Sequence, residues 1–144
     1  MAERTFVMIK PEHVPLAEEI LAELSSYGTL MGKAVIEAVP RSMIEEHYAI
    51  HRGRPFYHYL VDSFVGRPVV VAVYEGEGIV QKIMERCGPT DPAKAAKDTI
   101  RGKYSADSLE RAIAEQRPVR NVIHRSDSPA EAEREILVWR AYLH

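Results

Sequence analysis

The chain has 144 residues, a length that suits one domain with a single sizeable hydrophobic core. It is 46% hydrophobic and 28% charged with a formal net charge of −2, so the composition favours a folded globular protein without a general attraction to nucleic acid or anionic membranes. The apolar runs are too short to span a bilayer, no signal peptide is expected, and a single cysteine excludes an internal disulfide. We therefore expect one domain over residues 1–144 in a reducing cytoplasm.

Strands and helices alternate in the first half of the chain. β-Branched and aromatic side chains predict the first strand, which Pro11 ends, and apolar residues at helical spacing predict the helix that follows, with Gly28 as its stop signal. In chain order we expect a strand over residues 4–9, a helix over 12–27, a strand over 29–39, a helix over 42–51 and a short helical pair over 55–64.

The second half repeats the alternation. Ser128, Pro129 and Glu131 supply an N-cap, a first-turn proline and an N3 carboxylate, which together indicate the start of the last helix. Asp107 and Glu110 have capping-box spacing for a shorter helix before it. In chain order we expect a strand over residues 68–74, a helix over 78–87, a loop over 88–103, a short helix over 107–116, a strand over 119–123 and a helix from 128 to about 140.

This order of elements fits two architectures. It suits a doubly wound α/β fold, and its βαββαβ order equally suits a ferredoxin-like sandwich with an antiparallel sheet. The pattern alone does not separate the two.

Three features suggest chemistry but have simpler explanations. The Glu75-Gly76-Glu77-Gly78 turn lacks the third glycine of a dinucleotide-binding loop, because Gln81 stands there, so an ordinary strand-to-helix turn is favoured. His47, His51 and His58 could include two metal ligands on one helical face, but there is no HExxH pattern, and a solvated helix face is favoured. Cys87 lies on an apolar helix face and is expected in the core.

His124 is a stronger candidate, because it stands where a strand ends and a loop begins. Glu135 follows eleven residues later, between Ala132 and Trp139 on the packed side of the last helix, where a carboxylate needs a partner. His124 is a plausible partner, with Ser126 as a bridge. A histidine held in this way keeps one nitrogen lone pair free for nucleophilic attack, although a structural ion pair remains the alternative.

A basic loop between residues 90 and 103 is the other candidate. Thr90, Thr99, Arg101 and Lys103 offer hydroxyls, a guanidinium fork and an ammonium, a combination that suits a polyphosphate. A solvated basic loop would have the same composition.

Short motifs spread over nearly the whole chain resemble the nucleoside diphosphate kinase family. The matching segments are Glu3-Arg4-Thr5-Phe6, Ile9-Lys10-Pro11, Glu46-His47-Tyr48, Arg54-Pro55-Phe56, Pro68-Val69-Val70, Glu75-Gly76-Glu77, Gly88-Pro89-Thr90-Asp91-Pro92, Thr99-Ile100-Arg101-Gly102, Asn121-Val122-Ile123-His124, Ser126-Asp127-Ser128, Glu133-Arg134-Glu135-Ile136 and Trp139. Each segment is short, but their order and spacing make coincidence a poor explanation.

The resemblance implies an α+β, ferredoxin-like fold with a four-stranded antiparallel sheet and surrounding helices. It also implies a Mg²⁺-dependent ping-pong reaction in which a nucleoside triphosphate, mainly ATP, gives its γ-phosphoryl group to His124 and a different diphosphate collects it. In the implied catalytic set, Glu135 orients the ring of His124, Ser126 supports that pair, Tyr48 borders the histidine and Lys10 contacts phosphate.

The resemblance further implies how the nucleotide is held. Lys10 and Asn121 would reach the sugar, Phe56 would stack on the base, and Thr90 and Arg101 would grip the distal phosphates. Stacking tolerates any base, since every base has a π-face. Mg²⁺ would arrive on the nucleotide phosphates, without a metal site in the protein. A homo-hexamer, or a tetramer, is implied, with no membrane or specific nucleic-acid partner.

The chain departs from the family pattern in four places. The stretch after Lys10 is about two residues shorter than usual, and Arg125 replaces a small residue after the histidine. About ten extra residues separate Arg101 from His124, and we assign them to the helix over 107–116. Met84 stands where the family has a phosphate-binding arginine, and Arg86 lies about 200° around a regular helix from that position.

Two other functions remain open. A non-catalytic nucleotide-binding relative, acting in assembly or regulation, is favoured by Met84 but disfavoured by the retained His124 and Glu135. A ferredoxin-like nucleic-acid binder is disfavoured by the acidic net charge and by the lack of an aromatic-basic strand motif.

Overall fold

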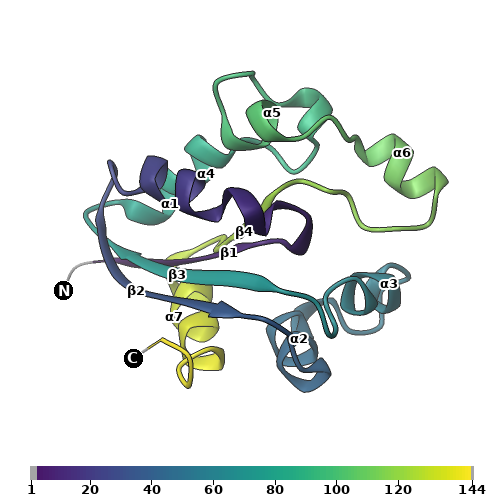
Figure 1. The fold of residues 1–144 in the computed structure, drawn as a ribbon, viewed down its shortest axis with the longest axis horizontal. Coiled ribbons are helices and arrows are strands. Elements are labelled where there is room, and N and C mark those ends of the chain that lie inside the picture. Colours follow the sequence, from purple (N-terminus) through teal and green to yellow (C-terminus); the bar gives the residue numbers. More distant parts are fainter. Residues whose placement is uncertain (1–2, 144) are drawn as a thin grey trace.

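The computed structural model describes residues 3–143, which form a four-stranded antiparallel sheet flanked by helices (Figure 1). The strands are β1 (Arg4–Ile9), β2 (Thr29–Ile36), β3 (Val69–Glu75) and β4 (Ile123–Arg125), in the order β2-β3-β1-β4. All three strand pairs are antiparallel. The ferredoxin-like prediction is therefore confirmed, and the doubly wound alternative, which needs a parallel sheet, is wrong.

Helices cover both faces of the sheet. They are α1 (Ala17–Leu24), α2 (Arg41–His47), α3 (Tyr57–Asp62), α4 (Ile79–Cys87), α5 (Ile100–Tyr104), α6 (Leu109–Ala114) and α7 (Pro129–Val138), with short 3₁₀ segments η1 (Pro11–Leu16), η2 (Ala49–His51) and η3 (Pro92–Lys94). Within residues 3–143, no helix has both the length and the apolar character needed to cross a membrane.

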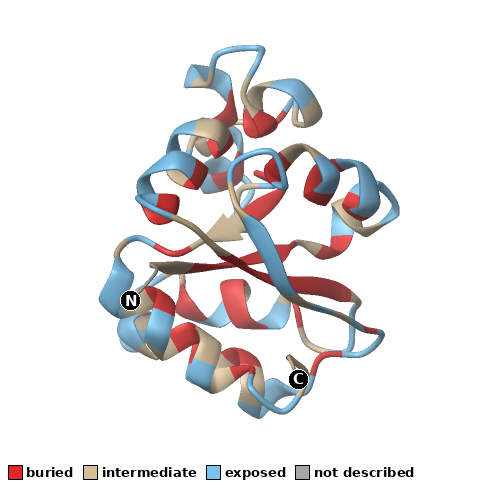
Figure 2. Ribbon diagram, turned by 90° about the vertical axis from the view of Figure 1, so that its left-hand side faces the viewer, coloured by how far each residue is buried: buried red, intermediate tan, exposed pale blue. Residues whose placement is uncertain are grey.

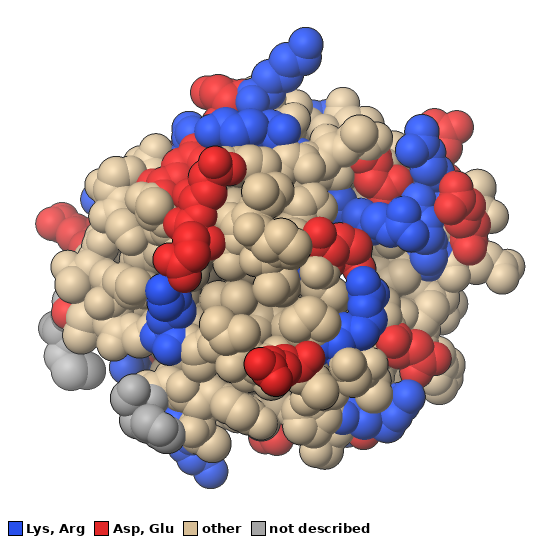
Figure 3. Space-filling model, in the orientation of Figure 1, with Lys and Arg blue, Asp and Glu red and all other residues tan. Residues whose placement is uncertain are grey.

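Two hydrophobic cores lie on opposite faces of the sheet, because successive strand residues point to opposite sides. Val7 and Ile9 of β1 pack with α1 and α4, whereas Phe6 and Met8 pack with α2, α3 and Trp139. Figure 2 shows the buried residues concentrated in the central strands and on the helix faces that meet the sheet. On the face drawn in Figure 3, acidic and basic side chains are interspersed.

Several expected boundaries were wrong. The helix over 12–27 is divided into η1 and α1, with Pro15 inside the 3₁₀ turn. The segment over 42–51 divides into α2 and η2, and the pair over 55–64 is a single helix, α3. The loop over 88–103 contains η3 and the first part of α5.

The last strand is the largest correction. We expected it over 119–123, but β4 begins only at Ile123. Val122 has φ 77°, a conformation that β-branched residues rarely adopt, so the chain turns sharply just before the strand. Its carbonyl oxygen accepts a hydrogen bond from the Lys10 amide, 2.9 Å away. This turn places His124 and Arg125, rather than the preceding valines, on the sheet edge.

Side-chain caps fix the helices on either side of β4. Ser128 caps α7 by accepting a hydrogen bond from the Glu131 amide at 3.1 Å, as predicted. For α6, the predicted capping box at Asp107 is wrong, because Ser108 is the N-cap and accepts from the Arg111 amide. Asp107 instead binds Arg117, which lies just beyond the other end of the helix.

Candidate active site

A cleft of about 500 Å³ opens at the end of the sheet where β1 and β4 lie side by side. One wall comes from the end of α2, from η2 and from α3, and the opposite wall comes from α6 and the segment after it. In Figure 1, α3 and α6 face each other across this end of the molecule. The residues expected to act in catalysis or binding that line the cleft are Lys10, Tyr48, Phe56, Thr90, Arg101, Asn121, His124 and Glu135.

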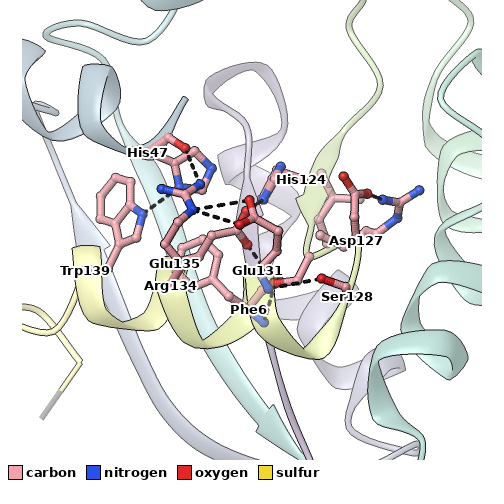
Figure 4. Close-up of polar contacts among 12 residues, drawn as sticks. Phe6, His47, His124, Asp127, Ser128, Glu131, Arg134, Glu135 and Trp139 are labelled. Carbon is pink, nitrogen blue, oxygen red and sulfur yellow. Dashed lines mark hydrogen bonds and ion pairs between the residues drawn. The ribbon is translucent and has the colours of Figure 1, made fainter. Parts of the chain in front are cut away.

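His124 is held from behind by a carboxylate. Its Nε2 lies 2.9 Å from Oε2 of Glu135, which is 3% exposed, and an ionised carboxylate can only accept, so Nε2 carries the proton (Figure 4). Ser126 donates from Oγ to the other carboxylate oxygen at 2.7 Å and accepts from the Phe6 amide at 3.1 Å. The arrangement leaves Nδ1 of His124 as the ring nitrogen with a free lone pair.

His47 lies beside this group, and our expectation that it belonged to a solvated helix face was wrong. Its side chain is 1% exposed, and its ring centroid lies 4.5 Å from that of His124 in an edge-on arrangement. Trp139 donates from Nε1 to Nδ1 of His47 at 3.0 Å, as Figure 4 shows. Burial, followed by the proximity of His124, holds the pKa of His47 well below its ordinary value. Its position three residues after the apolar Ile44 on α2 is the sequence signal for this burial.

A resident metal ion does not fit these groups. His47, His124 and Glu135 offer ligand atoms within 4.8 Å of one another, but Nδ1 of His47 accepts from Trp139, so Nε2 must carry the proton and cannot ligate. Mg²⁺ prefers several oxygen ligands in octahedral geometry. Of the described residues that line the cleft, only Glu135 and Asp127 carry carboxylates, and both are engaged by other side chains. Magnesium is therefore compatible with the cleft only when it is coordinated by the oxygens of a bound ligand.

Lys10 and Asn121 form a second polar group. Lys10 donates from Nζ to Oδ1 of Asn121 at 2.6 Å, and Asn121 donates from Nδ2 to the Thr90 carbonyl oxygen at 3.0 Å. Burial, and then the like charge of Arg101, lower the pKa of Lys10 to about 7. Glu12 opposes this shift only in part, so a bound anion would stabilise the charge of Lys10 further.

Arg101 supports the backbone around the histidine. It is 4% exposed and donates to three carbonyl oxygens, those of Asn121 at 3.2 Å, Gly88 at 2.9 Å and Ile123 at 2.8 Å. Burial lowers its pKa to about 10. Since a guanidinium has five N–H donors, two remain for a ligand. Arg101 therefore acts first as a brace between α4 and the turn before β4.

Aromatic side chains complete the wall opposite α6. Tyr48 is 6% exposed, its ring centroid lies 5.9 Å from that of His124, and burial raises its pKa above the ordinary value. Phe56 is partly exposed in the cleft. Its ring packs edge-to-face with the ring of His51, with the two centroids 5.2 Å apart. Phe56 thus presents an apolar surface to the interior of the cleft.

Arg86 lies away from the cleft, as the helical geometry of α4 predicted. Its Nε donates to Oε1 of Glu23 on α1 at 3.0 Å. Met84 is partly buried, and neither residue is among the described residues that line the cleft. The expected core position of Cys87 is confirmed, because its side chain is fully buried.

Comparison with known proteins gives one consistent result. The family model described as "Nucleoside diphosphate kinase" matches residues 3–141. A Heliobacterium modesticaldum protein named nucleoside diphosphate kinase is 42% identical over 95% of this chain and 87% of its own length, and an Archaeoglobus fulgidus protein of the same name is 41% identical over 95% and 85%. Among solved structures, an NDP kinase from Pyrobaculum aerophilum is 30% identical with a TM-score of 0.86 over 96% of both chains. A nucleoside-diphosphate kinase from Borrelia burgdorferi, a transition-state mimic with bound vanadate and ADP, is 25% identical with a TM-score of 0.90 over 96% of this chain and 86% of that one.

Proposed function

The chain belongs to the nucleoside diphosphate kinase family, and we propose that this phosphotransferase carries the phosphoryl group on Nδ1 of His124. The observation that carries the proposal is the chain of contacts from Ser126 through Glu135 to Nε2 of His124. It fixes which nitrogen holds the proton and leaves the other free to attack.

The proposed reaction has two matched halves. In the first, the Nδ1 lone pair of His124 forms a bond to the γ-phosphorus of ATP, and the bond between that phosphorus and the bridging oxygen breaks, so ADP leaves with the electron pair. In the second, an oxygen of a different nucleoside diphosphate attacks the phosphorus and the lone pair returns to Nδ1. The Nε2 proton stays with the ring throughout. Glu135 balances the positive charge that the ring gains.

The surrounding residues would bind and orient the nucleotide. Lys10 and Arg101 would neutralise phosphate charge, and Asn121 would hold Lys10 in place while reaching toward the sugar. Thr90 would contact a distal phosphate, Tyr48 would border the reacting histidine, and Phe56 would stack on the base. Phosphoryl transfer depends mainly on such positioning and charge neutralisation. Magnesium, bound to the nucleotide phosphates, would add further charge neutralisation.

We further propose that the substrates are ATP and other nucleoside di- and triphosphates, without strong base preference. We assign residues 1–144 to a single domain and place the protein in the cytoplasm. We also propose a homo-hexamer, or a tetramer, in which the exposed side chains of Leu30, Met31 and Val35 on the edge strand β2 lie in a subunit interface. An edge strand with exposed apolar residues is a surface that natural proteins usually cover.

The test is transfer of a labelled γ-phosphoryl group from ATP to the protein. We expect an acid-labile label that a second nucleoside diphosphate removes, and we expect His124→Ala to abolish it. His58→Ala is the matched control, since His58 is exposed and lies outside the cleft. A wild-type protein that binds ADP but takes no label would instead support the non-catalytic relative.

A further inference from the structure

Arg125 places a second guanidinium at the cleft. It follows His124 on β4, where His124 pairs with Met8 and Arg125 pairs with Val7, so the two side chains leave opposite faces of the sheet. Arg125 lines the cleft, and its side chain is 14% exposed. Burial raises the pKa of Cys87, at the end of α4, and lowers the pKa of Arg101, and the positive charge of Arg125 contributes to lowering both. The guanidinium therefore lies near α4 and the brace formed by Arg101.

The hydrogen bonding of Arg125 is incomplete. One terminal nitrogen pairs with Asp127, whose side chain is 68% exposed. Its Nε is buried and has no acceptor among the described residues. A buried donor on a charged group is unfavourable when it lacks an acceptor. The side chain is thus held in place at one end and left unsatisfied at the other.

Neighbouring arginines are already engaged. Arg101 donates to three backbone carbonyl oxygens, and Arg86 binds Glu23. Arg117, on the other side of the cleft, binds both carboxylate oxygens of Asp107 at 2.7 and 2.9 Å. Among these described arginines, Arg125 is the one whose Nε is buried without an acceptor.

We propose that Arg125 is a phosphate-binding residue, whose guanidinium turns toward the cleft so that Nε and the second terminal nitrogen donate to one phosphate of the bound nucleotide while Asp127 keeps the first terminal nitrogen. The inference rests on the proposed function, because it assumes that the cleft accepts a polyphosphate. A guanidinium fork matches two phosphate oxygens, and the anion would also relieve the repulsion between Arg125 and Arg101.

The test compares a ligand with phosphates and one without. Calorimetry would measure the Kd of ADP with Mg²⁺, and of adenosine, for the wild type, Arg125→Gln and Arg125→Lys. We expect Arg125→Gln to weaken ADP binding about tenfold and adenosine binding less than about twofold. Arg125→Lys should lie between, since it keeps the charge but loses the fork. Arg41→Ala is the matched control, because Arg41 forms an exposed ion pair with Asp62 away from the cleft.

Other outcomes overturn the proposal. Unchanged ADP affinity in Arg125→Gln would do so, and so would equal losses for ADP and adenosine, which indicate a structural role. If Arg125→Gln does not fold, unchanged ADP affinity in Arg125→Lys would overturn it. The two proposals fail separately: an unlabelled wild type contradicts phosphoryl transfer through His124, whereas a labelled wild type with unaffected Arg125 variants contradicts this inference alone.

Discussion

Nζ of Lys10 lies 2.6 Å from Oδ1 of Asn121, and both residues line the cleft beside His124. Burial, and then the charge of Arg101, lower the pKa of Lys10 to about 7, so the free protein carries this lysine partly uncharged at neutral pH. A bound phosphate favours the charged form and raises that pKa again. Nucleotide binding should therefore take up a proton at and above neutral pH.

We predict that ADP binds most tightly below pH 7, and that its affinity falls as the pH rises through the pKa of Lys10 in the free protein. The sign follows because the bound state holds the additional proton. Calorimetry at pH 8, in two buffers with different ionisation enthalpies, measures the protons taken up. Lys10→Met should remove this uptake, while ionisation of ADP itself contributes equally to both proteins. Equal uptake in the wild type and Lys10→Met would contradict the prediction.

Glu135→Gln should slow phosphorylation of His124 more than it weakens nucleotide binding. The amide can still accept from Nε2 of His124, so the ring keeps its place, but the negative charge that balances the ring is lost. We expect the phosphorylation rate to fall roughly ten- to a hundredfold. Rapid-quench labelling at saturating ATP measures it, and Glu131→Gln is the control on the same helix. An unchanged rate with a large loss of ADP affinity would disprove the assignment.

Asp107 should stabilise the segment around α6 at neutral pH and lose this effect in acid. The Arg117 side chain, together with the Arg120 amide 2.8 Å away, holds the pKa of Asp107 well below its ordinary value of 3.8. Its stabilisation is therefore fully present above pH 3.8 and is lost as the pH falls toward the folded-state pKa. Asp107→Asn should lower Tm by roughly 2–4 °C at pH 7 and by less below pH 3.8.

Thermal unfolding of Asp107→Asn and Glu115→Gln would check this prediction. Glu115 binds the same arginine but is 55% exposed, so its removal should change Tm little. Equal effects of the two substitutions, or a Tm difference that does not shrink in acid, would show that the Asp107 pair is not the source of the stability.

Local signals predicted the parts of the fold that local physics determines. The start of α7 follows from Ser128 and its neighbours, because an N-cap hydrogen bond spans three residues. The pairing of His124 with Glu135 also followed from the sequence, since helical spacing placed the carboxylate on the buried side of α7.

Longer-range contacts explain what the sequence did not predict. Val122 has φ 77° and the Asn121 carbonyl accepts from the guanidinium of Arg101, so the chain turns here and β4 begins only at Ile123. The buried state of His47 depends on Trp139, far along the chain. Hydrophobic periodicity carries no information about either kind of contact.

Ile113 belongs to α6, in the segment that lengthens the interval between Arg101 and His124. Ile113 is 70% exposed, yet it lines the cleft on the wall opposite Phe56. An exposed apolar side chain there can pack against a flat ring, such as a nucleobase, that lies against Phe56. Burial of part of this side chain should contribute to binding whether or not the ligand carries phosphates.

Ile113→Asp should therefore weaken adenosine binding about three- to tenfold, and ADP binding by at least as much, because the new carboxylate also repels the phosphates. This result would differ from the loss confined to ADP that we expect for Arg125→Gln. The matched control is Leu137→Asp, because Leu137 is also exposed, at 60%, but belongs to α7 and does not line the cleft. Calorimetry of both ligands measures the effect, and labelling of His124 at saturating ATP should proceed at the wild-type rate. If adenosine bound Ile113→Asp and the wild type equally well, α6 would not contact the base, and the ten extra residues would need another explanation.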